Sequence, residues 1–216
     1  AASALAAFGM GEALPSLLAG LRDSNARVRL QCTKALARQL SPAEAAQAVP
    51  VLTWKAEYDP ERVVRLESVR TLGAIADGPS VAFLEALLVN RAAALDFRET
   101  ALSALLARTP AAAGIRTAVE QEMAAKDQKP IEMIARVLSL AKGPELAPVW
   151  TRLLDGTGYL VRICGVRGLA ANGVTAASAR LGELAEKDPV PAVRTEASRA
   201  LERLRATPGA PTSSTR

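Results

Sequence analysis

The feature of this sequence that most constrains its fold is a short phrase that returns at a nearly constant interval. The phrase is an apolar residue followed by Arg, with a small residue three positions after the Arg and Leu seven positions after it. The arginines of the phrase are Arg29, Arg65, Arg98, Arg162 and Arg194. Their spacings are 36, 33, 64 and 32 residues, so the longest spacing contains two repeats. Such a period predicts a stack of similar structural units.

The missing copy of the phrase is expected near residue 133, where residues 130–141 carry a helical pattern. Met133 or Glu132 would take the Arg position of this copy, and Leu140 or Leu138 would take its Leu position. The sequence leaves this register open.

Each copy of the phrase predicts one helix, because its apolar and small residues fall on one side when residues advance by about 100°. A second amphipathic segment precedes each copy, at residues 13–21, 42–57, 80–90, 111–126, 144–154 and 175–187. Asp, Gly and Pro residues lie between the segments, where they favour turns. The sequence therefore predicts six helical hairpins.

Composition agrees with helices and argues against most catalytic chemistry. Hydrophobic residues make up 50% of the chain and aromatic residues 3%, so the core is built from small and aliphatic side chains. The chain has no histidine, which removes the commonest general base and the commonest metal ligand. Cys32 and Cys164 lie four repeats apart and are expected to remain thiols. We expect no metal, no cofactor and no enzymatic activity.

The phrase resembles the HEAT-like repeat family, in particular its short repeats of the bilin-lyase type, in which a turn Asp is followed six residues later by Arg. The pairs Asp23 with Arg29, Asp59 with Arg65 and Asp188 with Arg194 have this spacing, whereas Asp155 and Arg162 are seven apart and Ala92 stands at the Asp position before Arg98. The resemblance implies an all-α fold, a right-handed α-solenoid or superhelix of about six HEAT-like hairpins. It also implies that these Asp and Arg residues join the turns of adjacent repeats into a structural ladder, for which an anion site or an acid catalyst is the alternative. An Asp that begins a helix would also cap its first turn.

The two ends of the chain differ from the repeats. Residues 1–9 are expected to be the second half of a second helix, which belongs to a partial N-terminal repeat, so that residues 1–206 form one HEAT-like solenoid. Residues 207–216 have the composition of a linker and are expected to form a flexible C-terminal tail. No stretch has the length and apolar character of a membrane span. We expect a cytoplasmic protein, with a periplasmic location as the open alternative.

Basic residues recur on the second helix of each hairpin, on the face that the resemblance places on the concave surface. The position five residues after the Arg holds Lys34, Arg70, Ser103, Leu138, Arg167 and Arg199, of which Leu138 depends on the open register of the fourth repeat. Arg38 and Arg203 add charge nine residues after the Arg. These basic residues either solvate an exposed face or line a groove for an acidic partner. The candidate partner-binding residues are Lys34, Arg38, Arg70, Arg167, Arg199 and Arg203.

A non-catalytic scaffold that binds a partner polypeptide is the function that these features favour. The formal net charge of +5 also permits nucleic-acid binding, although few aromatic residues are present for base stacking. A lyase role together with a partner subunit is a third reading of the resemblance. Trp54 and Trp150 lie on first helices, where either could be a contact hot spot or packing between repeats.

Overall fold

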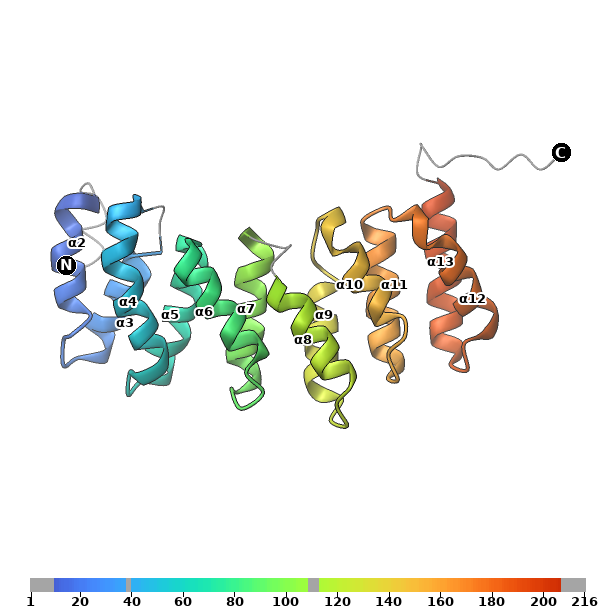
Figure 1. Cartoon of the computed structure of the whole chain (residues 1–216), viewed down its shortest axis with the longest axis horizontal. Coiled ribbons are helices and arrows are strands. Elements are labelled where there is room, and N and C mark those ends of the chain that lie inside the picture. Colours follow the sequence, from blue (N-terminus) through green and yellow to red (C-terminus); the bar gives the residue numbers. More distant parts are fainter. Residues whose placement is uncertain (1–9, 38–39, 109–112, 207–216) are drawn as a thin grey trace. The chain divides into compact units, whose positions relative to one another are not determined.

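A computed structural model of the chain describes residues 10–37, 40–108 and 113–206 (Figure 1). Every regular element in these ranges is a helix, so the predicted all-α fold is confirmed. The predicted partial repeat at residues 1–9, the predicted tail at residues 207–216 and Arg38 lie outside the described residues.

The helices follow one another as pairs, and each pair is joined by a short turn. In the part of the chain that the structure describes, the pairs are α2 (Met10–Gly20) with α3 (Ala26–Ala35), α4 (Pro42–Tyr58) with α5 (Arg62–Ile75), α6 (Gly78–Val89) with α7 (Leu95–Arg108), α8 (Ala113–Met123) with α9 (Lys129–Leu138), α10 (Ala147–Leu153) with α11 (Tyr159–Ala171), and α12 (Ser178–Lys187) with α13 (Pro191–Ala206). The 3-10 turns η1 (Pro144–Leu146) and η2 (Thr175–Ala177) lead into α10 and α12. These bounds agree closely with the segments that the sequence predicted.

Local sequence explains where several helices begin. Ser41 and Glu44 form a capping box at the start of α4, and Pro42 occupies its first turn, where the missing amide hydrogen is not needed. The Asp77 side chain accepts from the backbone N–H of Ser80 at the start of α6. The Asn25 side chain accepts from the backbone N–H of Arg27 at the start of α3.

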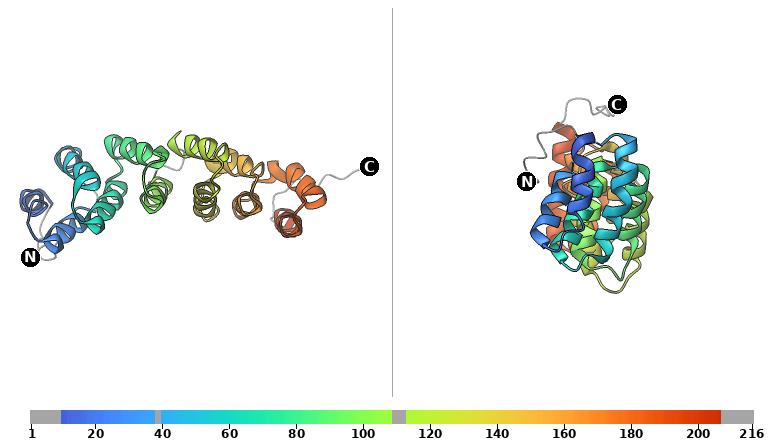
Figure 2. Two further views of the ribbon diagram at one scale, coloured as in Figure 1. Left: turned by 90° about the horizontal axis from the view of Figure 1, so that it is seen from below. Right: turned by 90° about the vertical axis from the view of Figure 1, so that its left-hand side faces the viewer.

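The chain forms two compact units, Ala1–Ile115 and Arg116–Arg216. Within the first unit, the second helices α3, α5 and α7 lie side by side, and α2, α4 and α6 pack against them. Within the second unit, α9, α11 and α13 lie side by side, and α10 and α12 pack against α11 and α13. Figure 2 shows the first and second helices of each unit as two layers.

Small residues let the paired helices approach closely. Trp150 of α10 is fully buried, and its indole covers Gly168 of α11, where a Cβ atom would collide with the ring. The Trp150 Nε1–H donates to the backbone carbonyl of Leu138 in α9 at 2.9 Å. Trp150 therefore packs between repeats, which is the structural role considered from the sequence.

Burial fixes the register of the fourth repeat. The buried residues Ile131, Ile134, Ala135 and Leu138 of α9 have the same spacing as Arg162, Gly165, Val166 and Leu169 of α11. The Arg position is thus occupied by Ile131, so the choice of Met133 or Glu132 was wrong. Of the two candidates for the Leu position, Leu138 is buried, whereas Leu140 is 79% exposed. The position five residues after the Arg position is therefore Arg136 and not Leu138.

Candidate protein-binding surface

Arg29 joins the first repeat to the second through buried polar contacts. Its Nε and Nη2 donate to the two carboxylate oxygens of Asp59 at 2.8 and 2.9 Å, and its Nη1 donates to the backbone carbonyl of Asp23 at 2.9 Å. Asp59 has no exposed surface and also accepts from Lys55 Nζ at 2.9 Å. We call this two-repeat contact, an Arg of one repeat on the Asp of the next, a rung.

A second rung lies in the other unit. The Nε and Nη2 of Arg162 donate to the carboxylate of Asp188 at 2.7 and 2.9 Å, and its Nη1 donates to the backbone carbonyl of Gly156 at 2.8 Å. Arg194 in turn donates to the backbone carbonyl of Asp188 at 2.7 Å. Both rungs cross from one hairpin to the next, which is the geometry of a structural ladder.

Other residues assigned to the ladder lie in different contacts. Asp155 is exposed and pairs with Arg180 at 2.9 Å, because Gly156 occupies the turn position that Arg162 contacts. Arg65 donates to the backbone carbonyl of Asp59, and Arg98 donates to that of Leu88. In both rungs, an Asp stands at the turn of the following repeat.

The predicted capping role of the turn aspartates needs a correction. The carboxylates of Asp23, Asp59 and Asp188 accept from the backbone N–H two residues later, at 2.7, 3.0 and 2.9 Å. They therefore close the turn before the helix, whereas Asn25 caps α3 itself.

The rung carboxylates are held in the charged form. Burial alone would raise the pKa of Asp59, but hydrogen bonds from Arg29 and Lys55 outweigh it and keep that pKa below its ordinary value. Burial would also raise the pKa of Asp188, but hydrogen bonds that include the one from Arg162 outweigh it. The pKa of Asp188 therefore also lies below its ordinary value. Each rung thus buries a satisfied ion pair, which gives both partners a structural reason to be present.

Exposed arginines recur on the second helices of the second unit. Arg136 of α9, Arg167 of α11 and Arg199 of α13 occupy one position in three successive repeats, and all three are exposed. We call these three residues the arginine row. Sequence reasoning missed Arg136, because the phrase was aligned on an Arg that this repeat lacks. Aligning the buried apolar residues of α9 would have found it.

Arg167 is the best-defined member of the arginine row. Its Nε donates to Glu196 of α13 at 3.0 Å, and this hydrogen bond raises the pKa of Arg167 above its ordinary value. The Arg167 side chain is nevertheless 56% exposed. Arg203 is exposed about one turn beyond Arg199 in α13, which extends the basic character of this helix.

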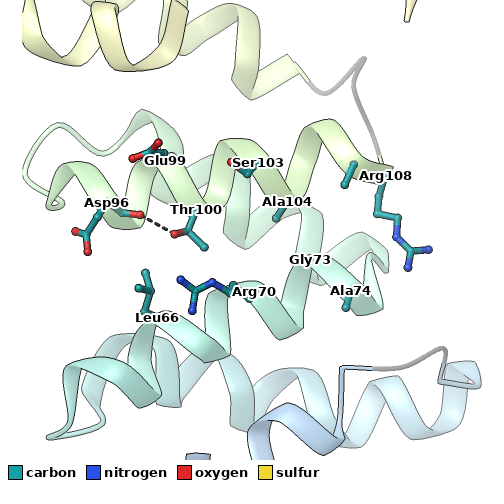
Figure 3. Close-up of a pocket in the computed structure, with 11 residues that line it drawn as sticks. Leu66, Arg70, Gly73, Ala74, Asp96, Glu99, Thr100, Ser103, Ala104 and Arg108 are labelled. Carbon is teal, nitrogen blue, oxygen red and sulfur yellow. Dashed lines mark hydrogen bonds between the residues drawn. The ribbon is translucent and has the colours of Figure 1, made fainter. Parts of the chain in front are cut away.

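The basic residues of the first unit lie in a surface of mixed charge. Lys34 of α3 and Arg70 of α5 are exposed as the sequence predicted. Arg70 pairs with Glu67 at 3.1 Å and borders a groove of about 630 Å³ between α5 and α7. Figure 3 shows that Asp96 and Glu99 lie along the same groove, opposite Arg70. This groove is less suited to an acidic partner than the arginine row.

The first helices present one exposed aromatic pair. Trp54 and Tyr58 of α4 are 51% and 62% exposed, and their ring centroids are 5.7 Å apart. Trp54 borders a surface groove of about 530 Å³ together with Pro50 and Val51. Trp54 therefore differs from the buried Trp150, and a contact role for it stays a prediction.

The two cysteines have the properties of unreactive thiols. Burial raises the pKa of Cys32 and of Cys164, which disfavours the nucleophilic thiolate at neutral pH. A hydrogen bond with Ser139 and the positive charges of Arg167 and Arg136 act on the pKa of Cys164 in the opposite sense.

The described part of the chain has neither a metal-binding cluster nor a membrane-spanning helix. Within residues 10–37, 40–108 and 113–206, no cluster of three or more Cys, Asp or Glu residues could hold a metal ion. No helix in these ranges is long and apolar enough to cross a membrane.

The fold and the rungs define a repeat protein of paired α-helices. Residues 14–106 match the family model for HEAT repeats, which confirms the resemblance of this part of the chain to HEAT repeats. No curated protein matches the chain in sequence.

Three solved structures are similar to this chain at low sequence identity. A crystal structure of YibA from Escherichia coli is 12% identical with a TM-score of 0.53, and the match covers 95% of this chain and 86% of that one. The complex of CpcE and CpcF of phycocyanin lyase from Nostoc is 16% identical over 85% of this chain and 74% of that one, with a TM-score of 0.49. Human deoxyhypusine hydroxylase is 18% identical over 95% and 89%, with a TM-score of 0.47.

Proposed function

We propose that this chain is a non-catalytic scaffold that binds an acidic partner polypeptide on its second helices. The observation that carries the proposal is the arginine row, in which Arg136, Arg167 and Arg199 are exposed at one position of three successive repeats. Exposed guanidinium groups bind carboxylates through several N–H donors, so a row of them favours a partner with several carboxylates.

The arginine row differs from the rungs in its exposure. The arginines of the rungs are buried and cross between hairpins, whereas the row arginines are exposed. The pair of Arg167 with Glu196 is an exposed contact, which typically stabilises a protein by about 0.2 to 1 kcal/mol. Binding is therefore the better reason for three exposed arginines in register.

Two features support a non-catalytic role. The chain lacks histidine, so nucleophile pairs that depend on an imidazole base are impossible. Burial raises the pKa of both thiols, which weakens the remaining strong nucleophiles. We propose that the chain supplies a surface and that any chemistry belongs to its partner.

Charge reversal tests the proposal. Proteins captured by the immobilised chain at moderate salt would be identified, and their affinity would be measured against a variant with R136E, R167E and R199E. This variant changes the formal net charge from +5 to −1. The matched control is R116E with K126E and K187E, which makes the same change at exposed positions on or beside first helices of the same unit. We expect the row variant to lose at least about tenfold in affinity and the control to change little.

Nucleic-acid binding is the alternative function, favoured only by the basic balance of 27 Lys and Arg over 22 Asp and Glu. Three phosphate contacts to duplex DNA would give a slope of log affinity on log salt near −2.7. A DNA duplex that binds with this slope, and loses it in the row variant, would favour the alternative over the scaffold. A captured protein that binds the row variant and the control equally would remove the arginine row from the function.

A further inference from the structure

The spacing of the arginine row gives it a definite length scale. Arg136, Arg167 and Arg199 come from α9, α11 and α13, and α11 packs against both of the other helices. Axes of packed helices lie about 8 to 10 Å apart, so the row offers one guanidinium about every 8 to 10 Å. A partner that pairs with every member must present carboxylates at the same interval.

Two regular conformations of a polypeptide can meet this interval. A polyproline II helix rises about 3.1 Å per residue with three residues per turn, so every third side chain points the same way about 9 Å further on. An α-helix rises about 1.5 Å per residue, so side chains seven residues apart lie about 10.5 Å apart on one face. A flat β-strand fits poorly, because residues three apart point to opposite faces.

The extended conformation is favoured because it costs less free energy to order than the helix does. Three carboxylates seven residues apart need a helix of about 15 residues, and shorter isolated helices are marginal in water. The extended segment needs only seven residues, and like charges along it oppose compaction and keep it extended. The partner segment can therefore bind with little reorganisation.

The central arginine is already positioned for such a partner. The hydrogen bond from its Nε to Glu196 restrains the Arg167 guanidinium, which carries five N–H donors in total. The side chain of Arg167 is 56% exposed, while that of Glu196 is 18% exposed. The Nη groups can accordingly receive a partner carboxylate while Glu196 keeps its place.

We propose that the second helices of residues 116–206 recognise an extended segment with Asp or Glu at every third residue, one carboxylate for each arginine of the row. This inference rests on the proposed function and narrows it from an acidic polypeptide to a particular spacing of charge. The sequence of a partner would then be recognisable by its period of three.

Three synthetic peptides test the spacing in NMR titrations of the labelled full chain at low salt. The first has Glu at positions one, four and seven of a Ser heptamer. The second has the same composition with the three Glu residues in succession. The third is a 15-residue Ala-rich helical peptide with Glu at positions one, eight and fifteen.

We expect the first peptide to bind roughly tenfold more tightly than the second, since each exposed pair contributes about fivefold at most. The triple variant R136Q, R167Q and R199Q should lose this preference, and the control R116Q, K126Q and K187Q should keep it. Tighter binding of the helical peptide than of the first peptide would overturn the extended conformation.

Failure of the spacing and failure of the function give different results. Equal affinities for the first two peptides, both lost in the triple variant, would overturn the period of three and leave an acidic-binding surface. If no peptide binds, and if the captured partner binds the triple variant as tightly as the unmodified chain, both the spacing and the proposed function are wrong.

Discussion

Replacing Asp59 by Asn tests whether the rungs hold the repeats together. The carboxylate of Asp59 is fully buried and accepts hydrogen bonds from Arg29, Lys55 and the backbone N–H of Glu61, at distances between 2.8 and 3.0 Å. Asn has nearly the same shape, but it is neutral, and one of its two terminal groups donates where the carboxylate accepts. Arg29 and Lys55 would then be buried cations that have lost the carboxylate they share.

Removing one partner of a buried ion pair typically costs about 3 to 5 kcal/mol. Repeats of a solenoid contact only their neighbours, so the loss should act locally. We expect hydrogen exchange, followed by mass spectrometry, to quicken by about a hundredfold or more in α3 to α5, with little change in α11 to α13.

The control for this prediction is Asp155→Asn. Asp155 pairs with Arg180 at the surface, where its side chain is 50% exposed, so its loss should cost about 1 kcal/mol or less. If Asp59→Asn and Asp155→Asn change hydrogen exchange equally, the buried rung does not stabilise the chain more than the exposed ion pair, and the reasoning is refuted.

Three further predictions concern packing and pH. Gly168→Ala should destabilise the chain by about 1 to 3 kcal/mol in urea denaturation, because the new methyl group meets the Trp150 ring, whereas Gly182→Ala in α12, with open space at its Cβ, should stabilise it by about 0.5 to 1 kcal/mol. Trp150→Ala should cost about 3 to 5 kcal/mol, and Trp54→Ala, at a half-exposed position, should cost much less in the same assay. Because the pKa of Asp59 lies below its ordinary value near 4, its contribution is complete above about pH 4 and is lost as the pH falls through the folded-state value. Denaturation across an acid series should therefore show a shallower decline for Asp59→Asn than for the unmodified chain.

The helical hairpins could be predicted from the sequence, because the repeated phrase records contacts that every repeat must make. Arg29 and Arg162 are buried, and each contacts both its own turn and the Asp at the turn of the next repeat. Because one Arg makes both contacts, it recurs in the sequence at the period of the repeat. Leu72 and Leu169, at the Leu position, are likewise fully buried, so their spacing marks the inner side of each second helix.

The fourth repeat shows where this reasoning fails. Ile131 fills the Arg position by apolar packing alone, so the phrase disappears although the helix remains. Reading the repeat from Met133 or Glu132 displaced every later position, and Arg136 was assigned no role. Exposed positions carry no packing constraint of their own. An exposed residue can therefore be assigned to a position in the repeat only from the register of its buried neighbours.

The placement of turn aspartates failed for a related reason. Spacing alone suggested that Asp155 belongs with Arg162, one residue out of step. The structure gives that turn to the backbone of Gly156, because Arg162 contacts a carbonyl, which any residue supplies. Of these two acceptors of Arg162, only the carboxylate depends on which residue is present. That carboxylate belongs to Asp188, a full repeat away.

The direction of the rung limits how such a chain can grow. An Arg reaches forward to the Asp of the following repeat, so copying a whole block that begins with the Asp and ends after the Arg creates a matched pair at the new junction. Duplication of the second repeat would place a copied Asp59 after Arg65, where Ala92 now stands at the corresponding turn. Exchanging the order of repeats would instead separate Arg162 from Asp188 and leave two buried charges unmatched. Tandem duplication is therefore the route of lengthening that the rungs tolerate, and shuffling is the one that they penalise.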